Sequence, residues 1–226
     1  MSDDRQTTPS PTGPGEGASS GSAPARPVTN WNLPNALTTL RILLVPLFAW
    51  LLLVDDGQDA TYRFWAFVVF TLAILTDKID GELARSRNLV TDFGKLMDPI
   101  ADKALTGMAF IGLSIIGELW WWVTIVVLAR EWGITLMRFW IIKYGVMPAS
   151  RGGKIKTTLQ AVALGALILP LRDLDGAWNT VGEVLWWMAI LVMAAAVVVT
   201  VVTGIDYVRE AMRLRREGQA AERSNT

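Results

Sequence analysis

The stretch that decides the fold begins Asp77-Lys-Ile-Asp80-Gly81-Glu-Leu-Ala84-Arg85 and resumes as Gly94-Lys-Leu-Met-Asp98-Pro-Ile-Ala-Asp102-Lys103. Apolar runs flank it on both sides, at residues 64–75 and 104–116. Carboxylates this close to sequence of membrane-spanning hydrophobicity are costly, because in lipid they need partners. The stretch therefore predicts a functional site next to a membrane.

Apolar residues elsewhere are gathered into blocks. The 226 residues are 52% hydrophobic, with a mean hydropathy of +0.36. A helix of about 20 apolar residues is long enough to cross a bilayer. Six such blocks lie near residues 36–54, 62–80, 96–117, 119–142, 155–171 and 181–205. We therefore expect an all-α polytopic membrane protein, a bundle of six transmembrane helices, because helices satisfy their own backbone hydrogen bonds in lipid.

The two ends of the chain differ from these blocks. Residues 1–30 are rich in Ser, Thr, Pro, Gly and Ala, so we expect a disordered tail without chemistry of its own. No cleavage-like flank precedes the first block, so no secretory signal peptide is expected. Trp31 and Pro34 suit a short N-terminal interfacial helix. The expected division is a tail at 1–30, a membrane domain at 31–208 and a basic tail at 209–226 that continues the last helix.

Basic residues alternate along the connections between the blocks. The second and fourth connections and the C-terminal tail are rich in Lys and Arg, whereas the first, third and fifth are not. Arg63 is the one basic residue of the first connection and lies at its end, after three aspartates. The tryptophans at 120–122 and 186–187 lie where aromatic residues at a membrane interface are expected. By the positive-inside rule, both termini and the aspartate stretch are expected on the cytoplasmic side of the cytoplasmic (inner) membrane.

The composition excludes several kinds of site. The net charge is zero, which does not favour a nucleic-acid binder, and the chain has no Cys and no His. A zinc site with nitrogen or sulfur ligands and histidine acid–base chemistry are therefore excluded. Any metal must be held by oxygen, which favours Mg²⁺, Mn²⁺ or Ca²⁺.

The aspartates fall on two predicted helix faces. Asp77 and Asp80 share one face with Gly81 and Ala84, at spacings of three, four and seven residues. Small residues on that face allow close approach of a helix or a flat ligand, and Arg85 suits a phosphate. The second face holds residues spaced by four, namely Gly94, Asp98 and Asp102.

Four carboxylates converging from two helices would repel one another unless cations lie between them. A pair of divalent cations relieves that repulsion, and two-metal sites of this kind serve phosphoryl chemistry. The alternative interpretation is that the aspartates are solvated and paired with neighbouring lysines, at positions 78, 95 and 103.

A third polar face precedes the first apolar block. Asn35, Thr38 and Arg41 are spaced by three and lie on one side of a helix. This stripe either belongs to an interfacial helix or faces a polar cavity, and Arg41 is the residue we expect to matter.

The aspartate pattern is similar, position for position, to the signature of the CDP-alcohol phosphatidyltransferases. The resemblance implies a six-helix membrane enzyme, usually a homodimer, with two divalent cations (Mg²⁺ or Mn²⁺) at the cytoplasmic surface. Such enzymes displace CMP from a CDP-linked donor by an acceptor hydroxyl. The resemblance implies that the metal ligands are Asp77, Asp80, Asp98 and Asp102, and that Asp102 is also the catalytic base. It further implies that the donor is bound by Asp77, Gly81, Ala84, Arg85 and Gly94.

Within that family, three further stretches look like the phosphatidylglycerophosphate synthase branch. They begin at Asn32, at Asp98 and at Arg130, and the third ends at Gln160. Basic residues in and near these stretches could hold the phosphate of a phosphorylated acceptor, and they are Arg41, Arg130, Arg138, Arg151, Lys154 and Lys156. Arg130, with Glu131, interrupts an apolar run, so we expect it to be buried and paired.

These observations favour transfer of a phosphatidyl group from CDP-diacylglycerol to glycerol 3-phosphate, in phospholipid biosynthesis. Two other acceptors stay open, phosphatidylglycerol (giving cardiolipin) and inositol phosphate. A divalent-cation transporter is the alternative from another class, although the aspartates lie at one end of the bundle rather than near the midplane.

Overall fold

All regular structure in the described part of the chain is helical. The computed structural model describes residues 33–86, 92–141, 152–174 and 176–224. In chain order the elements are α1 (Leu33–Leu53), η1 (Val54–Gly57), α2 (Ala60–Ser86), α3 (Asp92–Ile115), α4 (Trp121–Ile141), α5 (Gly152–Ile168), η2 (Leu171–Asp173), η3 (Gly176–Trp178) and α6 (Asn179–Ser224). The all-α prediction is therefore confirmed for these residues.

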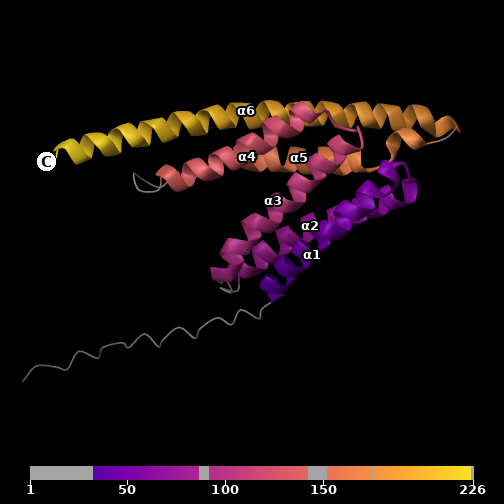
Figure 1. Ribbon diagram of the computed structural model, residues 1–226, viewed down its shortest axis with the longest axis horizontal. Coiled ribbons are helices and arrows are strands. Elements are labelled where there is room, and N and C mark those ends of the chain that lie inside the picture. The colour runs from indigo at the N-terminus through magenta and orange to yellow at the C-terminus, as the bar shows by residue number, and fades with distance from the viewer. Residues whose placement is uncertain (1–32, 87–91, 142–151, 175, 225–226) are drawn as a thin grey trace, which may run out of the picture.

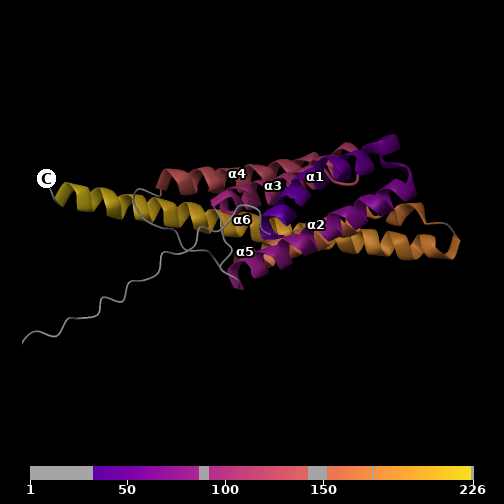
Figure 2. The ribbon, with the colours of Figure 1, turned by 90° about the horizontal axis from the view of Figure 1, so that it is seen from below.

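The helices form a bundle with the long helix α6 along one side (Figure 1). α5 runs along α6, α4 also contacts α6, and α1 packs against α2 and α3. The C-terminal ends of α2 and α4 and the N-terminal end of α3 lie toward the same end of the bundle (Figures 1 and 2). The two halves of the aspartate stretch therefore approach each other at that end.

Four segments of the described chain are long and apolar enough to cross a membrane. They are Asn35–Gly57, Ala60–Asp77, Ile155–Asp173 and Asn179–Glu217. The other two long helices are interrupted by charge, because Asp102 and Lys103 lie within α3, and Arg130 and Glu131 within α4. The chain is an integral membrane protein, and the same charged residues provide its candidate site.

The interior of the bundle is apolar, and so is much of its outer surface. Phe48, Phe70 and Phe110 are fully or almost fully buried between the helices. On the outside, Leu191 is 71% exposed and Leu136 is 65% exposed. Large aliphatic side chains spread over such an area suit lipid tails, since soluble proteins rarely expose extended apolar surfaces.

Arg63 ties four parts of the bundle together at the end opposite the aspartates. Its Nε and Nη2 donate to the carbonyl oxygens of Ile168 at 3.1 Å and Leu167 at 2.8 Å, at the end of α5. Its Nη1 donates to Glu118 Oε1 at 2.8 Å, and Trp186 Nε1 donates to Glu118 Oε2 at 2.7 Å. The last carbonyls of a helix lack partners within the helix, so this buried guanidinium completes the end of α5.

Helices α1 and α6 form the two ends of the described chain, and α6 continues into the basic tail as expected. α1 runs without a break from Leu33 to Leu53, so no separate short interfacial helix stands apart from it in the described residues. Residues 1–30 lie outside the described part. At the other end, α6 continues to Ser224 and extends past the end of α4 (Figure 1). The division into two tails and a membrane domain stays a prediction.

Candidate functional site

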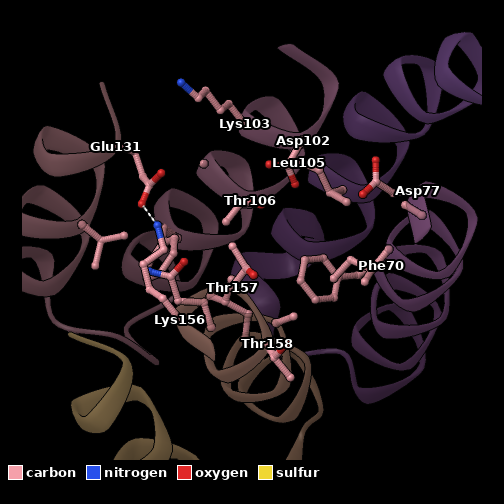
Figure 3. A pocket seen from close by; sticks show the side chains of 18 of the residues that line it. Phe70, Asp77, Asp102, Lys103, Leu105, Thr106, Glu131, Lys156, Thr157 and Thr158 are labelled. Carbon is pink, nitrogen blue, oxygen red and sulfur yellow. Dashed lines mark hydrogen bonds and ion pairs between the residues drawn. The ribbon is translucent and has the colours of Figure 1, made fainter. Parts of the chain in front are cut away.

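A cavity of about 410 Å³ lies among α1 to α5. Apolar side chains such as Phe70, Leu105 and Phe110 form much of its wall. The charged groups lining it are Arg41, Asp77, Asp102, Lys103, Glu131 and Lys156. In Figure 3 the carboxylates of Asp77 and Asp102 lie on one side of the cavity, and Glu131 and Lys156 on the other. A mostly apolar cavity with a few converging charged groups is the usual form of a ligand site.

Arg41 forms an ion pair with Asp77 and reaches the cavity from α1. The guanidinium Nη1 donates to Asp77 Oδ1, and the Arg41 side chain is only 1% exposed. Asn35 and Thr38, on the same face of α1, are also buried. The polar stripe of α1 therefore faces the interior of the bundle, and of its three residues Arg41 lines the cavity. The first carboxylate of the aspartate stretch thus has a buried arginine of another helix as a partner.

Asp77 and Asp102 bring the two predicted aspartate faces to one cavity. Asp77 lies on α2 and Asp102 on α3, and both line the cavity. Asp80 lies three residues after Asp77, and Asp98 lies four residues before Asp102, so each shares a helix face with the described carboxylate. The side chains of Asp80 and Asp98 lie outside the described part.

Lys156 enters the cavity from α5 and pairs with Glu131 of α4. Its Nζ donates to Glu131 Oε1, and its side chain is 4% exposed, compared with 25% for Glu131. Lys156 also interacts electrostatically with Asp102. A buried ammonium must be paired with a carboxylate, and the cavity contains more than one. Glu131 was not among the site residues predicted from the sequence. Its position beside Arg130 within an apolar run could have indicated that it is functional.

Arg130 points away from the cavity, toward α6. Its Nη2 donates to Thr203 Oγ1 at 3.0 Å, and its guanidinium lies 5.8 Å from the centre of the Tyr207 ring. Its Nη1 donates to Glu131 Oε1 at 3.2 Å. The expectation that Arg130 is largely buried and paired is confirmed. It is not among the residues that line the cavity, so it contacts the cavity only through Glu131.

Lys103 lines the cavity but is not paired with an aspartate in the interactions of the described side chains. Its Nζ donates to Thr135 Oγ1 and lies 5.2 Å from the centre of the Trp132 ring. Its ammonium is therefore directed toward α4 rather than toward Asp102.

The other predicted site residues lie outside the described side chains. For the donor these are Gly81, Ala84, Arg85 and Gly94, whose backbones belong to α2 and α3. For the acceptor they are Arg138 on α4, Lys154 on α5 and Arg151, which lies between these helices. Their roles stay predictions.

The donor set at the cavity suits a hard divalent cation. Asp77 and Asp102 present carboxylate oxygens from two helices, and the chain has no His or Cys that would favour a softer metal. Two carboxylates directed into one cavity repel each other, and in the described structure Arg41 offsets part of that charge. Two of the four predicted ligands, Asp77 and Asp102, line the cavity, and the described residues contain no group of three or more side chains that could hold a metal ion. The oxygen chemistry of these two carboxylates is compatible with Mg²⁺ or Mn²⁺.

The amino-acid sequence was compared with models of known protein families. Residues 31–202 match the family model described as CDP-alcohol phosphatidyltransferase. The chain belongs to the CDP-alcohol phosphatidyltransferase family. It is therefore a transferase, and the matched region contains both aspartate-bearing helices and every helix that lines the cavity.

Curated relatives of this family cover most of the chain. One is a probable phosphatidylglycerophosphate synthase of Mycobacterium tuberculosis (strain H37Rv), 47% identical over 182 residues, which are 80% of this chain and 82% of the relative. Another is a CDP-diacylglycerol–glycerol-3-phosphate 3-phosphatidyltransferase of Bacillus subtilis (strain 168), 34% identical over 187 residues, 78% of this chain and 93% of the relative. A CDP-diacylglycerol–glycerol-3-phosphate 3-phosphatidyltransferase of Escherichia coli (strain K12) is 38% identical over 146 residues, 61% of this chain and 77% of the relative.

Proposed function

We propose that this membrane enzyme transfers the phosphatidyl group of CDP-diacylglycerol to glycerol 3-phosphate, giving phosphatidylglycerophosphate and CMP. The relatives named for this reaction support it, and so does the cavity. The observation that carries the proposal is that one cavity holds the carboxylates of Asp77 and Asp102 together with the ammonium of Lys156. The carboxylates suit a metal-bound pyrophosphate, and the ammonium suits an acceptor that has its own phosphate.

The proposed cofactor is a pair of divalent cations, Mg²⁺ or Mn²⁺. Asp77, Asp80, Asp98 and Asp102 would hold them, from α2 and α3. When bound, such cations neutralise the pyrophosphate and polarise its oxygens. The donor is proposed to rest against Gly81 and Ala84, where the small side chains leave room. Arg85 and Gly94 are proposed as further donor contacts.

The chain's own residues position and deprotonate the acceptor in this proposal. Lys156 binds the phosphate of glycerol 3-phosphate, and Arg138, Arg151 and Lys154 are further candidates for this contact. Asp102 accepts the proton of the attacking hydroxyl. The hydroxyl oxygen then bonds to the phosphorus next to the lipid, and the bond from that phosphorus to the CMP oxygen breaks.

Proposed membrane placement follows from the helices and the charges. We propose that α1 to α6 all cross the membrane, α3 and α4 with their charged faces turned to the cavity. The aspartate end and both termini would lie on the cytoplasmic side of the cytoplasmic membrane, where a soluble nucleotide can reach the site. A homodimer is the proposed assembly.

An acceptor assay tests the proposal. Purified protein in detergent is given CDP-diacylglycerol, Mg²⁺ and one of three labelled acceptors: glycerol 3-phosphate, phosphatidylglycerol or inositol phosphate. We expect CMP release and a labelled lipid with glycerol 3-phosphate. Product formed only from phosphatidylglycerol or only from inositol phosphate would overturn the proposed acceptor. Metal flux into liposomes without CMP release would overturn the enzymatic proposal.

A further inference from the structure

We infer that Glu131 is a positioning residue for the acceptor, because it holds the ammonium of Lys156 on the α4 side of the cavity, away from the aspartates. This inference rests on the proposed function. Its basis is the position of Glu131 between two basic side chains that face different parts of the molecule.

Glu131 contacts two basic side chains from different helices. Its Oε1 accepts hydrogen bonds from Lys156 Nζ on the cavity side and from Arg130 Nη1 at 3.2 Å on the α6 side. Arg130 is in turn held by Thr203 and by the ring of Tyr207. A Cβ added at Gly204 would lie 3.2 Å from Arg130 Cγ, so the arginine packs closely on α6. Glu131 is therefore held by α6 while it binds Lys156.

The charges of the cavity show why such a tether matters. Lys156 interacts electrostatically with Asp102 as well as with Glu131, and Asp102 faces the same cavity. Asp102, the proposed base, is the other cavity carboxylate with which the ammonium interacts, so without the Glu131 carboxylate we expect Lys156 to turn toward it. Lys156 would then approach the metal ligands and leave the place proposed for the acceptor phosphate. In this inference Glu131 keeps the Lys156 ammonium available for the acceptor phosphate, and the aspartates stay available to bind metal ions.

Steady-state kinetics of Glu131→Gln test this inference. CMP release is measured at saturating CDP-diacylglycerol and Mg²⁺ while glycerol 3-phosphate is varied. We expect the KM for glycerol 3-phosphate to rise by about tenfold or more, the loss expected for one charge-assisted hydrogen bond, with kcat changed by less than about threefold. The KM for CDP-diacylglycerol should stay as in the unmodified protein. If Glu131→Gln does not fold, Glu131→Asp takes its place, with an increase in the same KM expected.

Glu118→Gln is the matched control. Glu118 is also a largely buried carboxylate that accepts from an arginine, Arg63, but it lies at the opposite end of the bundle. A merely structural role for Glu131 predicts that both variants lose stability alike and keep the same KM. We expect Glu118→Gln to lose stability without any change in the KM for glycerol 3-phosphate.

A double-mutant cycle with Lys156→Met tests whether Glu131 acts through Lys156. We expect the double variant Glu131→Gln/Lys156→Met to match Lys156→Met in KM within about twofold, because the second change removes nothing further. The inference would be overturned if the two substitutions raised the KM for glycerol 3-phosphate independently, so that their factors multiply in the double variant. It would also be overturned if Glu131→Gln left that KM unchanged or lowered it. Either result leaves the proposed function intact. An unmodified protein that releases no CMP with glycerol 3-phosphate would overturn both.

Discussion

Arg41 Nη1 of α1 donates a hydrogen bond to Asp77 Oδ1 of α2, and the arginine is almost completely buried whereas the aspartate is half exposed. Because Arg41 is enclosed by the bundle, its hydrogen bond holds the Asp77 carboxylate in place at the wall of the cavity. A carboxylate held in this way loses little rotamer freedom when it takes part in a ligand site. We therefore propose that Arg41 positions the first aspartate of the signature.

Replacing Arg41 should therefore impair the site. We expect Arg41→Met to reduce CMP release by at least about tenfold, since Asp77 loses its buried charge-assisted hydrogen bond. Arg41→Lys should keep more activity, but not all of it, because a lysine cannot reproduce the planar guanidinium. The measurement is initial rate per folded enzyme, with folding checked by size-exclusion chromatography. Unchanged activity in folded Arg41→Met would show that Asp77 needs no such support.

Asp102→Asn tests the proposed base and metal ligand. We expect CMP release to fall by about 10²- to 10⁴-fold, the range usual for loss of a general base, without unfolding of the bundle. Asp56→Asn is the matched control, since Asp56 is an exposed carboxylate in η1, away from the cavity. It should behave like the unmodified protein. Full activity in folded Asp102→Asn would rule out both proposed roles.

Removal of divalent cations should stop the reaction. After treatment with EDTA we expect no CMP release, and addition of Mg²⁺ or Mn²⁺ should restore it, because the donor set contains only oxygen ligands. A second readout is thermal stability. Binding of cations between mutually repelling carboxylates should raise the unfolding temperature of the unmodified protein, and it should raise that of Asp102→Asn by less. Activity that survives chelation would contradict the metal proposal.

Helix content and the single polar face of α1 could be predicted from the sequence, because both depend on local spacing, whereas the direction of that face stayed open. Asn35, Thr38 and Arg41 recur every third residue, and that spacing alone puts them on one side of a helix. Asp77 and Asp102 could be expected at one site because they lie close together in the sequence beside apolar blocks, and the family signature supports this. Local spacing alone does not say that α2 and α3 meet.

The roles of Arg63 and Trp186 could not be predicted in this way. The sequence presents Arg63 as a charge at the end of a loop and Trp186 as part of an interfacial belt. In the structure both are hydrogen-bonded to Glu118, and Arg63 also binds carbonyls about a hundred residues further along the chain. Such contacts depend on tertiary packing, and periodicity carries no information about them. The same reason explains why Arg130 was expected near the acceptor but lies against α6.

Arg63→Met should destabilise the bundle without altering substrate binding. Glu118 would be left with a largely buried charge and the last carbonyls of α5 without a donor. Removing one partner of a buried ion pair costs about 3–5 kcal/mol. Unfolding by denaturant or heat in detergent measures this loss. The KM for both substrates, measured well below the unfolding temperature, should stay unchanged. A change in KM without loss of stability would place Arg63 in the site instead.

Gly182→Ala tests the packing of α6 on η2. A Cβ at Gly182 would lie 1.9 Å from the carbonyl oxygen of Leu171 and 3.0 Å from Leu174 Cδ1. No rotamer relieves a clash with backbone, so the helix or the η2 turn must shift, at a cost of about 1–3 kcal/mol. Gly133 in α4 is the matched control, because nothing lies within 4 Å of its added Cβ. Gly133→Ala should be neutral or stabilising by up to about 1 kcal/mol, since Ala is the better helix former. Equal thermal stability of the two variants in detergent would contradict the close approach of α6 to Leu171.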